Sequence, residues 1–136
     1  MIISASRSEN FNVVRRLNNP EWDEEKNLAV FGKANNKNFQ GQSYKLTVTL
    51  SGEPNPKTGY VYDIKLLKDI IIANVISLFD SKNLNLDTPF FKKTNPTIEN
   101  LAVVIWEILR LKIEAVYELK IKIKDAEGNS VEYSNT

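Results

Sequence analysis

Carboxylates and lysines are the side chains of this sequence that could do chemistry, because it contains no histidine and no cysteine. Without cysteine the chain has no thiol nucleophile, no thiolate zinc site and no disulfide. Without histidine it has no Ser-His-Asp relay and no side chain whose unperturbed pKa lies near neutrality. A zinc site is therefore not expected, whereas the 17 Asp and Glu residues could supply ligands for Mg²⁺ or Ca²⁺.

Three lysines, Lys120, Lys122 and Lys124, alternate with apolar residues and so lie on one face of a strand, a pattern that could bind nucleic acid. However, Glu118 opens the same face and Glu132 could lie opposite it. No aromatic side chains interleave with the lysines, as a surface for single strands requires. The whole chain carries 18 basic and 17 acidic residues. We interpret the lysines as a solvated strand face and expect neither nucleic acid nor a membrane as a partner.

The length of 136 residues, with 42% hydrophobic and 26% charged residues, is typical of one globular domain. The first residues lack the apolar core of a signal peptide. The longest apolar run, 70–73, is far shorter than the roughly 20 residues that span a bilayer. We expect a single domain over residues 1–136, located in the cytoplasm.

Four strands are expected where apolar residues recur at every second position. The clearest are 44–51 and 117–124. After a turn at 127–129, residues 130–133 can return as a short partner strand. The first dozen residues, ending near Val14, supply the fourth strand.

Two helices are expected between these pairs of strands. Residues 64–79 carry a broad apolar stripe, and Asp63 lies where an N-cap belongs. A second helix opens at 96–99, where Asn95 or Thr97 could cap it. The order of elements is therefore β-β-α-α-β-β.

This order predicts an α+β fold, in which an antiparallel sheet carries both helices on one face. Both helices are apolar over more than one stripe, which is more than four strands can cover. We therefore expect a homo-oligomer. Residues 18–40 are polar and are expected to form a long irregular excursion.

Six short strings, in order along most of the chain, resemble the 6-pyruvoyl tetrahydropterin synthase / 6-carboxytetrahydropterin synthase family. The family patterns are F-x-A-A-H-R-L, G-K-C-N-N, H-G-H-x-Y, a Gly-rich string ending in T-G-M-V-x-D, L-D-H-K-N-L-N and P-T-x-E-N. The matching segments of this chain are, in the same order, 11–17, 31–36, 39–44, 52–63, 79–85 and 95–100.

The resemblance implies a T-fold whose subunits assemble into an oligomeric barrel, usually a hexamer made of two trimers. It also implies an active site between subunits. There three His hold Zn²⁺, a Cys and an Asp-His pair move protons, and a Glu anchors the pterin ring. The family substrate is 7,8-dihydroneopterin triphosphate, which is converted to 6-pyruvoyl-tetrahydropterin or, for queuosine, to 6-carboxy-tetrahydropterin.

The zinc-binding positions implied by the resemblance carry Arg15, Gln40 and Gln42 instead of histidine. Amide oxygens are weak ligands compared with imidazole. A permanent positive charge at Arg15 repels a cation by Coulomb's law. We therefore expect the zinc of the family to be absent and the chain to need no cofactor.

The proton-transfer positions have changed as well. By the resemblance, Ala34 replaces the catalytic Cys and Ser81 replaces the His of the Asp-His pair, whereas Asp80 is retained. General acid–base catalysis is worth roughly 10²–10⁴-fold in rate. Loss of these groups together with the metal predicts negligible turnover of the family substrate.

The ligand-binding positions are better preserved. Asp125 aligns with the pterin-anchoring Glu but is one methylene shorter, and Thr97 and Glu99 are unchanged. One hypothesis is therefore a non-catalytic protein that binds a pterin- or purine-like ring, or that acts as a scaffold or regulatory subunit, alone or with an active paralogue. Arg15 could then pair with a phosphate or carboxylate.

Two alternatives remain open. In the first, Arg15, Gln40 and Gln42 only hydrogen-bond one another across an emptied metal cavity. In the second, catalysis persists as metal-free chemistry on a related substrate. The groups available for it are Asp80, Glu99, Asp125, Arg15 and Lys33.

Overall fold

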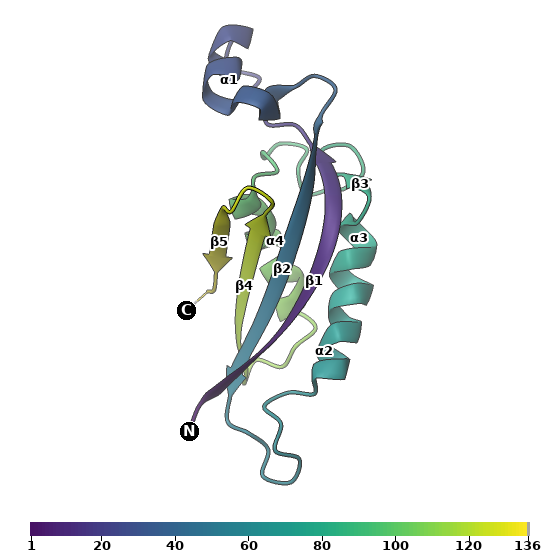
Figure 1. Cartoon of the computed structure of the whole chain (residues 1–136), viewed down its shortest axis with the longest axis vertical. Helices are drawn as coiled ribbons and strands as arrows, with labels where there is room; N and C mark the ends of the chain where they lie inside the picture. Colours follow the sequence, from purple (N-terminus) through teal and green to yellow (C-terminus); the bar gives the residue numbers. More distant parts are fainter. Residues whose placement is uncertain (136) are drawn as a thin grey trace.

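A five-stranded sheet in the order β3-β1-β2-β4-β5 forms one layer of the computed structural model, which describes residues 1–135 (Figure 1). The strands are β1 (Ile3–Arg15), β2 (Gln40–Gly52), β3 (Lys82–Asn83), β4 (Glu118–Asp125) and β5 (Ser130–Tyr133). Neighbouring strands are antiparallel, except that β1 and β3 run parallel. The two longest strands pair along their whole length, from Ile3 opposite Gly52 to Arg15 opposite Gln40.

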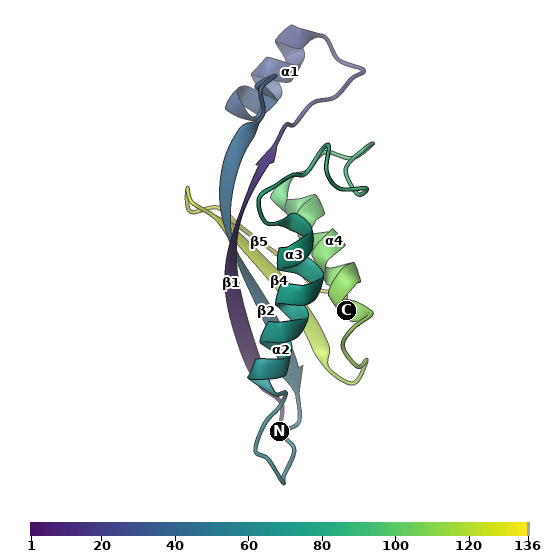
Figure 2. The ribbon, with the colours of Figure 1, turned by 90° about the vertical axis from the view of Figure 1, so that its right-hand side faces the viewer.

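Helices cover one face of this sheet. The helices are α1 (Glu24–Phe31), α2 (Ile64–Ile71), α3 (Ser77–Phe79) and α4 (Ile98–Arg110), with short helical turns at Gly32–Asn35 and Ile72–Ile76. The second of these turns is π-helical and joins α2 to α3 in one continuous rod. Figure 2 shows this rod and α4 packed on the same side of the sheet, while α1 lies beyond the sheet's end. The expected α+β architecture is confirmed.

The core lies between the sheet and these helices. Alternate residues of the central strands face it, because successive side chains of a strand point to opposite sides. Each fully buried leucine or isoleucine there stabilises the fold by about 1.5–3 kcal/mol. The core residues without exposed surface include Leu46, Val48, Leu50, Leu67, Ile71, Val75, Phe79, Leu101, Ile105, Leu109, Ile121 and Ile123.

Two side chains cap the sheet-covering helices as the sequence predicts. The Asp63 carboxylate accepts a hydrogen bond from the Lys65 amide at 2.9 Å. Thr97, one of the two candidates for the second helix, accepts from the Asn100 amide at 3.1 Å. Each such cap is worth about 1 kcal/mol. The Thr97 cap fixes the end of α4 that reaches the candidate site described below.

The predicted irregular excursion at 18–40 is wrong in part, because it contains α1. Asp23 caps this helix by accepting from the Lys26 amide at 2.8 Å. The helix has no apolar stripe, and its one buried residue is Asn27. The Asn27 amide accepts from the Asn19 backbone N–H and donates to the Asn19 carbonyl. A helix held down by a buried asparagine gives no hydrophobic period to detect.

The opposite face of the sheet is polar. Cross-strand hydroxyl pairs follow β1 and β2, for example Ser6 with Thr49 at 2.8 Å. On β4, Lys120 pairs with Glu132 of β5 at 3.0 Å, as expected for a solvated strand face. Among the described residues, no helix has the length and apolar character needed to cross a bilayer.

Candidate functional site

The three positions that the resemblance assigns to zinc lie on one end of the central strand pair. Arg15 ends β1 and is the cross-strand partner of Gln40, which begins β2. Gln42 lies two residues further along β2 and therefore points to the same side as Gln40. All three side chains are half-buried. Side chains paired in this way have Cβ atoms about 5 Å apart, so the three positions could surround one small ion or group.

These three side chains form hydrogen bonds with other atoms of the same chain. The Gln42 amide nitrogen donates to the Gln40 amide oxygen at 3.0 Å. Arg15 does not join this pair, because its Nη1 donates to the Pro96 carbonyl at 3.1 Å. The alternative in which all three side chains hydrogen-bond one another therefore holds only for the two glutamines. Arg15 instead connects the end of β1 to the segment before α4.

These residues do not fit the zinc ion of the family. The Gln40 oxygen, which a metal would need as a ligand, already accepts a hydrogen bond from Gln42. Arg15 places a permanent positive charge beside it. Within residues 1–135 there is no group of three or more His, Cys, Asp or Glu side chains that could hold a metal ion. The donor set is thus that of a polar, positively charged surface and not that of a metal centre.

Tyr44 is the buried centre of the site. It follows Gln42 on the same face of β2, pairs with Asp125 of β4 and packs edge-on against Phe11 at 5.7 Å. The pKa of its phenol is raised to about 12, chiefly by burial, with Asp125 and Glu99 contributing to the rise and Arg15 opposing it. The phenol therefore stays protonated at neutral pH and cannot serve as a base. Its hydroxyl is a hydrogen-bond donor surrounded by charged groups.

Two buried polar atoms of the site have no hydrogen-bond partner, namely the Tyr44 hydroxyl and the Arg15 Nε. Buried polar groups are nearly always paired in folded proteins, because an unpaired one costs about 1–3 kcal/mol. Both atoms are donors. They are therefore unused donors in the buried part of the site.

Substitution Tyr44→Phe is expected to raise the free energy of unfolding by about 1 kcal/mol, because it removes a buried hydroxyl that pairs with nothing. Urea denaturation measures this change. Tyr60→Phe, at an exposed position, is the matched control and should have no effect. A loss of stability in Tyr44→Phe would show instead that the hydroxyl has a partner in the folded protein.

Asp125 is held by its own turn. Its carboxylate accepts from the backbone N–H groups of Glu127 and Asn129, both at 2.9 Å, and from the Asn129 side chain at 3.0 Å. Burial pushes the pKa of Asp125 upward, but these hydrogen bonds and the Arg15 guanidinium outweigh it and hold the pKa below its usual value. The carboxylate is ionised at neutral pH. The Asp125 side chain is one methylene shorter than the Glu of the family pattern, and its oxygens mainly accept hydrogen bonds from the β4–β5 turn.

Thr97 and Glu99 occupy the N-terminal turn of α4. The Thr97 hydroxyl is used as the helix cap. The Glu99 side chain is exposed, and no hydrogen-bond partner for its carboxylate is found among the described residues. The negative charge of Glu99 contributes to the raised pKa of the Tyr44 phenol, so we group Glu99 with Tyr44, Arg15 and Asp125. Glu99 is therefore the acceptor of the site with the most unused capacity.

The three positions of the family's proton-transfer groups make their contacts elsewhere. Ala34 is buried and its carbonyl accepts from the Leu17 amide at 2.9 Å. The Ser81 N–H donates to the Asn12 carbonyl at 2.7 Å, and the Asp80 carboxylate accepts from the Asn12 N–H at 2.9 Å. Asp80 and Ser81 thus clamp one residue of β1. The retained Asp80 carboxylate is therefore used to hold the backbone of Asn12 in place.

Substitution Asp80→Ala is expected to lower the free energy of unfolding by about 1.5–3 kcal/mol, because it leaves the Asn12 amide without its ionised acceptor. Asp80→Asn keeps an acceptor oxygen and should lose less. Chemical denaturation of both variants, beside Asp69→Ala on the exposed face of α2, measures the difference. If Asp80→Ala were as stable as the control, the clamp would have no energetic role.

Tyr44 is the member of the site that sequence reasoning missed. In the sequence it is one of several alternating apolar residues of a strand, so it is interpreted as core. The available signal was its position, two residues beyond Gln42 on the same face of one strand and opposite Asp125 in a neighbouring one. The structure therefore brings together Arg15, Tyr44, Glu99 and Asp125.

Comparison with known proteins gives consistent matches along the chain. The family model of 6-pyruvoyl tetrahydropterin synthase matches residues 4–136. A Drosophila melanogaster protein named 6-pyruvoyl tetrahydrobiopterin synthase is 40% identical over 119 residues, which cover 85% of this chain and 71% of the relative. The human protein of the same name is 37% identical over 128 residues, covering 94% of this chain and 88% of the relative.

Solved structures agree with the sequence matches. The structure of Caenorhabditis elegans 6-pyruvoyl tetrahydropterin synthase superposes with a TM-score of 0.92 at 33% identity, covering 100% of this chain and 97% of the other. The Plasmodium vivax enzyme superposes at 0.70 with 14% identity, covering 99% of each chain, which supports the fold alone. From its sequence matches and its fold together, the chain belongs to the 6-pyruvoyl tetrahydropterin synthase family.

Proposed function

We propose that this chain is a non-catalytic member of its family, which binds a pterin- or purine-type ring without converting it. One observation carries the proposal. At the site, Arg15, Tyr44 and Glu99 offer donors and acceptors for a polar ring, while the three metal-ligand positions carry Arg15 itself and an amide pair. A site of this kind can bind a polar ring, but it has few groups that could catalyse a reaction of that ring.

The catalytic half of the proposal follows from what the remaining side chains can do. Gln40 and Gln42 share one hydrogen bond and carry no charge that could hold a cation. The Tyr44 phenol has its pKa raised to about 12 by burial, so it is not a base. The Asp80 carboxylate serves the Asn12 amide. Without a metal or a group that titrates near pH 7, neither carbonyl polarisation nor proton shuttling is supported.

The binding half rests on complementary hydrogen bonding. A pterin or guanine edge presents N–H donors beside a carbonyl acceptor. Glu99 can accept from such donors, and the unpaired Tyr44 hydroxyl and Arg15 Nε can donate to the carbonyl. Asp125 contributes negative charge, but its oxygens already accept three hydrogen bonds from the turn. We therefore assign the anchoring role to Glu99 ahead of Asp125.

Titration with neopterin, followed by the fluorescence of the pterin ring, tests this function. We expect saturable binding of neopterin and, when 7,8-dihydroneopterin triphosphate replaces it, an unchanged ligand on recovery from the complex. Absence of binding at millimolar ligand would contradict the binding half. Recovery of an altered ring would contradict the non-catalytic half and support the alternative of metal-free chemistry.

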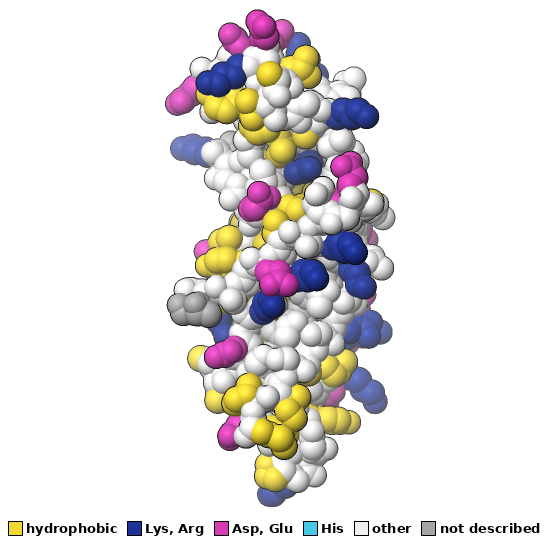
Figure 3. All heavy atoms as spheres, turned by 60° about the vertical axis from the view of Figure 1, so that its left-hand side comes forward, with side chains coloured by type: hydrophobic (Ala, Val, Ile, Leu, Met, Phe, Trp, Pro, Cys, Tyr) yellow, Lys and Arg dark blue, Asp and Glu magenta, His cyan; other side chains and the backbone are white. Residues whose placement is uncertain are grey.

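We also propose that the chain works as an oligomer, either with itself or with an active paralogue. Exposed apolar side chains support this, since soluble monomers seldom expose many together. Figure 3 shows them gathered over α1 and at the opposite end of the molecule, with mixed charges between. Sedimentation analysis should give a mass several times that of the chain, such as a hexamer; a monomer would contradict the proposal. The exposed residues include Met1, Ile2, Leu28, Val30, Tyr60 and Leu66.

A further inference from the structure

The first turn of α4, which carries Glu99, is joined to the end of β1 by two hydrogen bonds. The Arg15 Nη1 donates to the Pro96 carbonyl at 3.1 Å. The Asn95 side-chain oxygen accepts from the Asn18 backbone N–H at 2.9 Å. Asn95 and Pro96 directly precede the residue that caps α4. Both bonds therefore hold the chain just before the helix begins.

A further pair of hydrogen bonds braces the turn itself. The Asn100 side-chain nitrogen donates to the Asn95 carbonyl at 2.8 Å, and the Asn100 backbone N–H donates to the Thr97 hydroxyl at 3.1 Å. Asn100 follows Glu99 directly in the chain. Its side chain therefore ties the residue beside Glu99 back to the segment that Asn18 holds. The backbone that carries the Glu99 carboxylate is fixed from both sides.

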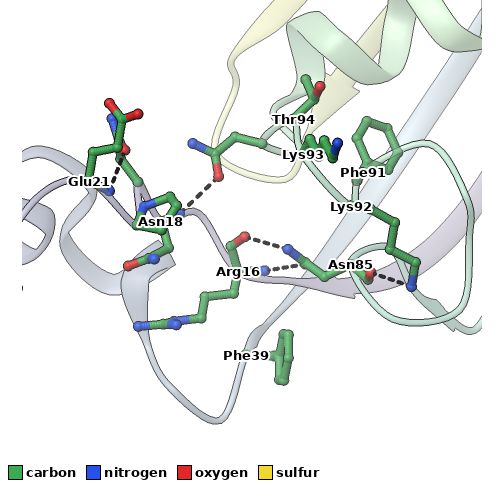
Figure 4. A pocket seen from close by; sticks show the side chains of 12 residues that line it. Arg16, Asn18, Glu21, Phe39, Asn85, Phe91, Lys92, Lys93 and Thr94 are labelled. Atoms are coloured by element: carbon green, nitrogen blue, oxygen red, sulfur yellow. Dashed lines mark hydrogen bonds between the residues drawn. The ribbon is translucent and has the colours of Figure 1, made fainter.

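The two segments that the Asn95 side chain joins enclose a cavity of about 590 Å³. One segment is the chain after β1, residues 16–21, and the other is the connection 85–95 that leads to α4. Figure 4 shows the bond to the Asn18 N–H as a dashed line that crosses from one segment to the other. The other hydrogen bonds between the segments join Arg16 to Asn85, at the far end of the connection. Near α4, the spacing of the two segments therefore depends on the Asn95 side chain.

The body of α4 is held independently of these hydrogen bonds. Leu101 and Ile105 have no exposed surface and lie in the core between the helices and the sheet. Buried side chains of this kind are closely packed and resist displacement. Loss of the Asn95 bond should therefore shift the first turn of α4 without releasing the helix from the sheet.

We propose that Asn95 and Asn100 are positioning residues, which hold the Glu99 carboxylate where it can accept hydrogen bonds from a bound ring. This inference rests on the function proposed above, in which Glu99 anchors the ring. The donors of the site, the Tyr44 hydroxyl and the Arg15 Nε, belong to β2 and β1. The link from β1 to α4 therefore sets the spacing between acceptor and donors. That spacing matters because hydrogen bonds require a donor–acceptor distance of about 2.7–3.2 Å.

Pterin and lumazine test this positioning, because the two rings differ at the edge that Glu99 would contact. Pterin presents an amino group beside a ring N–H, whereas lumazine has a carbonyl oxygen in place of the amino group. A correctly placed carboxylate accepts two hydrogen bonds from pterin but meets another acceptor in lumazine. In fluorescence titrations we expect the unaltered chain to bind pterin roughly tenfold more tightly than lumazine.

Substitution Asn95→Ala should weaken pterin binding roughly tenfold and lumazine binding much less, so the ratio of the two affinities falls toward one. Asn95→Asp keeps an oxygen that can accept from the Asn18 N–H and should restore most of the ratio. Asn100→Ala should lower the ratio as Asn95→Ala does. Asn55→Ala is the matched control, because the Asn55 side-chain oxygen also accepts from a backbone N–H, that of Lys57 at 2.8 Å, in the exposed loop before α2.

Amide hydrogen exchange, followed by nuclear magnetic resonance, tests the same residues without a ligand. The N–H groups of Asn100 and Leu101 both donate to Thr97 in the first turn of α4. In Asn95→Ala these two groups should exchange faster, while the N–H of Ile105 in the body of the helix should not. Unchanged exchange in the first turn would overturn the inference that Asn95 holds it.

The titrations separate this inference from the proposed function. No binding of pterin to the unaltered chain would overturn the function, and with it the anchoring role of Glu99. Pterin binding with the same ratio in Asn95→Ala and Asn55→Ala would overturn the positioning role alone. An equal fall in affinity for both rings in Asn95→Ala would show that Asn95 only supports the fold.

Discussion

Replacement of Arg15, Gln40 and Gln42 together by histidine is expected to turn a chain with no stoichiometric zinc into one that holds a single zinc ion. The backbone already places the three positions on one face of paired strands, with Arg15 opposite Gln40. Three imidazoles with an open fourth position are a ligand set that zinc favours. Zinc content after dialysis, measured by elemental analysis, gives the stoichiometry of the variant and of the parent chain.

The single substitution Gln42→His is the control for this experiment, because one imidazole beside a guanidinium should not retain zinc. Stoichiometric zinc in the unaltered chain would contradict the assignment of these positions. A folded triple variant that binds no zinc would show that the three positions do not converge on one ion.

Substitution Glu99→Ala is expected to weaken neopterin binding by roughly tenfold to a hundredfold. Loss of a hydrogen bond to an ionised group costs about 1.5–3 kcal/mol, which corresponds to that range of dissociation constants. Glu99 lies in the first turn of α4 and has no other hydrogen-bond partner among the described residues, so the fold should not depend on it. Fluorescence titration of the variant and the parent chain measures the change.

Glu107→Ala provides the matched control, since Glu107 is exposed on the same helix. It should bind neopterin as the parent chain does. Equal losses in both variants would point to a general effect of charge, and an unchanged affinity in Glu99→Ala would remove Glu99 from the site. Asp125→Asn should have the smaller effect, because the turn already uses its oxygens.

The regular elements of the fold could be predicted because burial leaves a period in the sequence. Alternation in 44–51 and 117–124 marks strands with one face in the core, and both are confirmed within longer or slightly shifted strands. The helix at α4 and the Asp63 cap follow in the same way. Where burial is polar, as at Asn27 of α1, there is no such period, and that helix was missed. The two-residue β3 is too short to show one.

The candidate site could be predicted in part, because its members come from distant segments. The family resemblance singled out Arg15, Glu99 and Asp125, and the charges of all three act on the pKa of the Tyr44 phenol. Sequence alone did not reveal that the Asp125 carboxylate turns back to Asn129, or that Arg15 reaches the Pro96 carbonyl. These are local choices between competing hydrogen bonds, and a pattern of residue types does not encode them.

Conversion of 7,8-dihydroneopterin triphosphate by the purified chain, in the presence of added zinc, tests the central claim most directly. The Drosophila melanogaster relative, at 40% identity, serves as the positive control. We predict no product above the uncatalysed background, whatever the zinc concentration. Zinc-dependent turnover at a rate comparable with that of the control would show that the side chains at these positions still support the family's reaction.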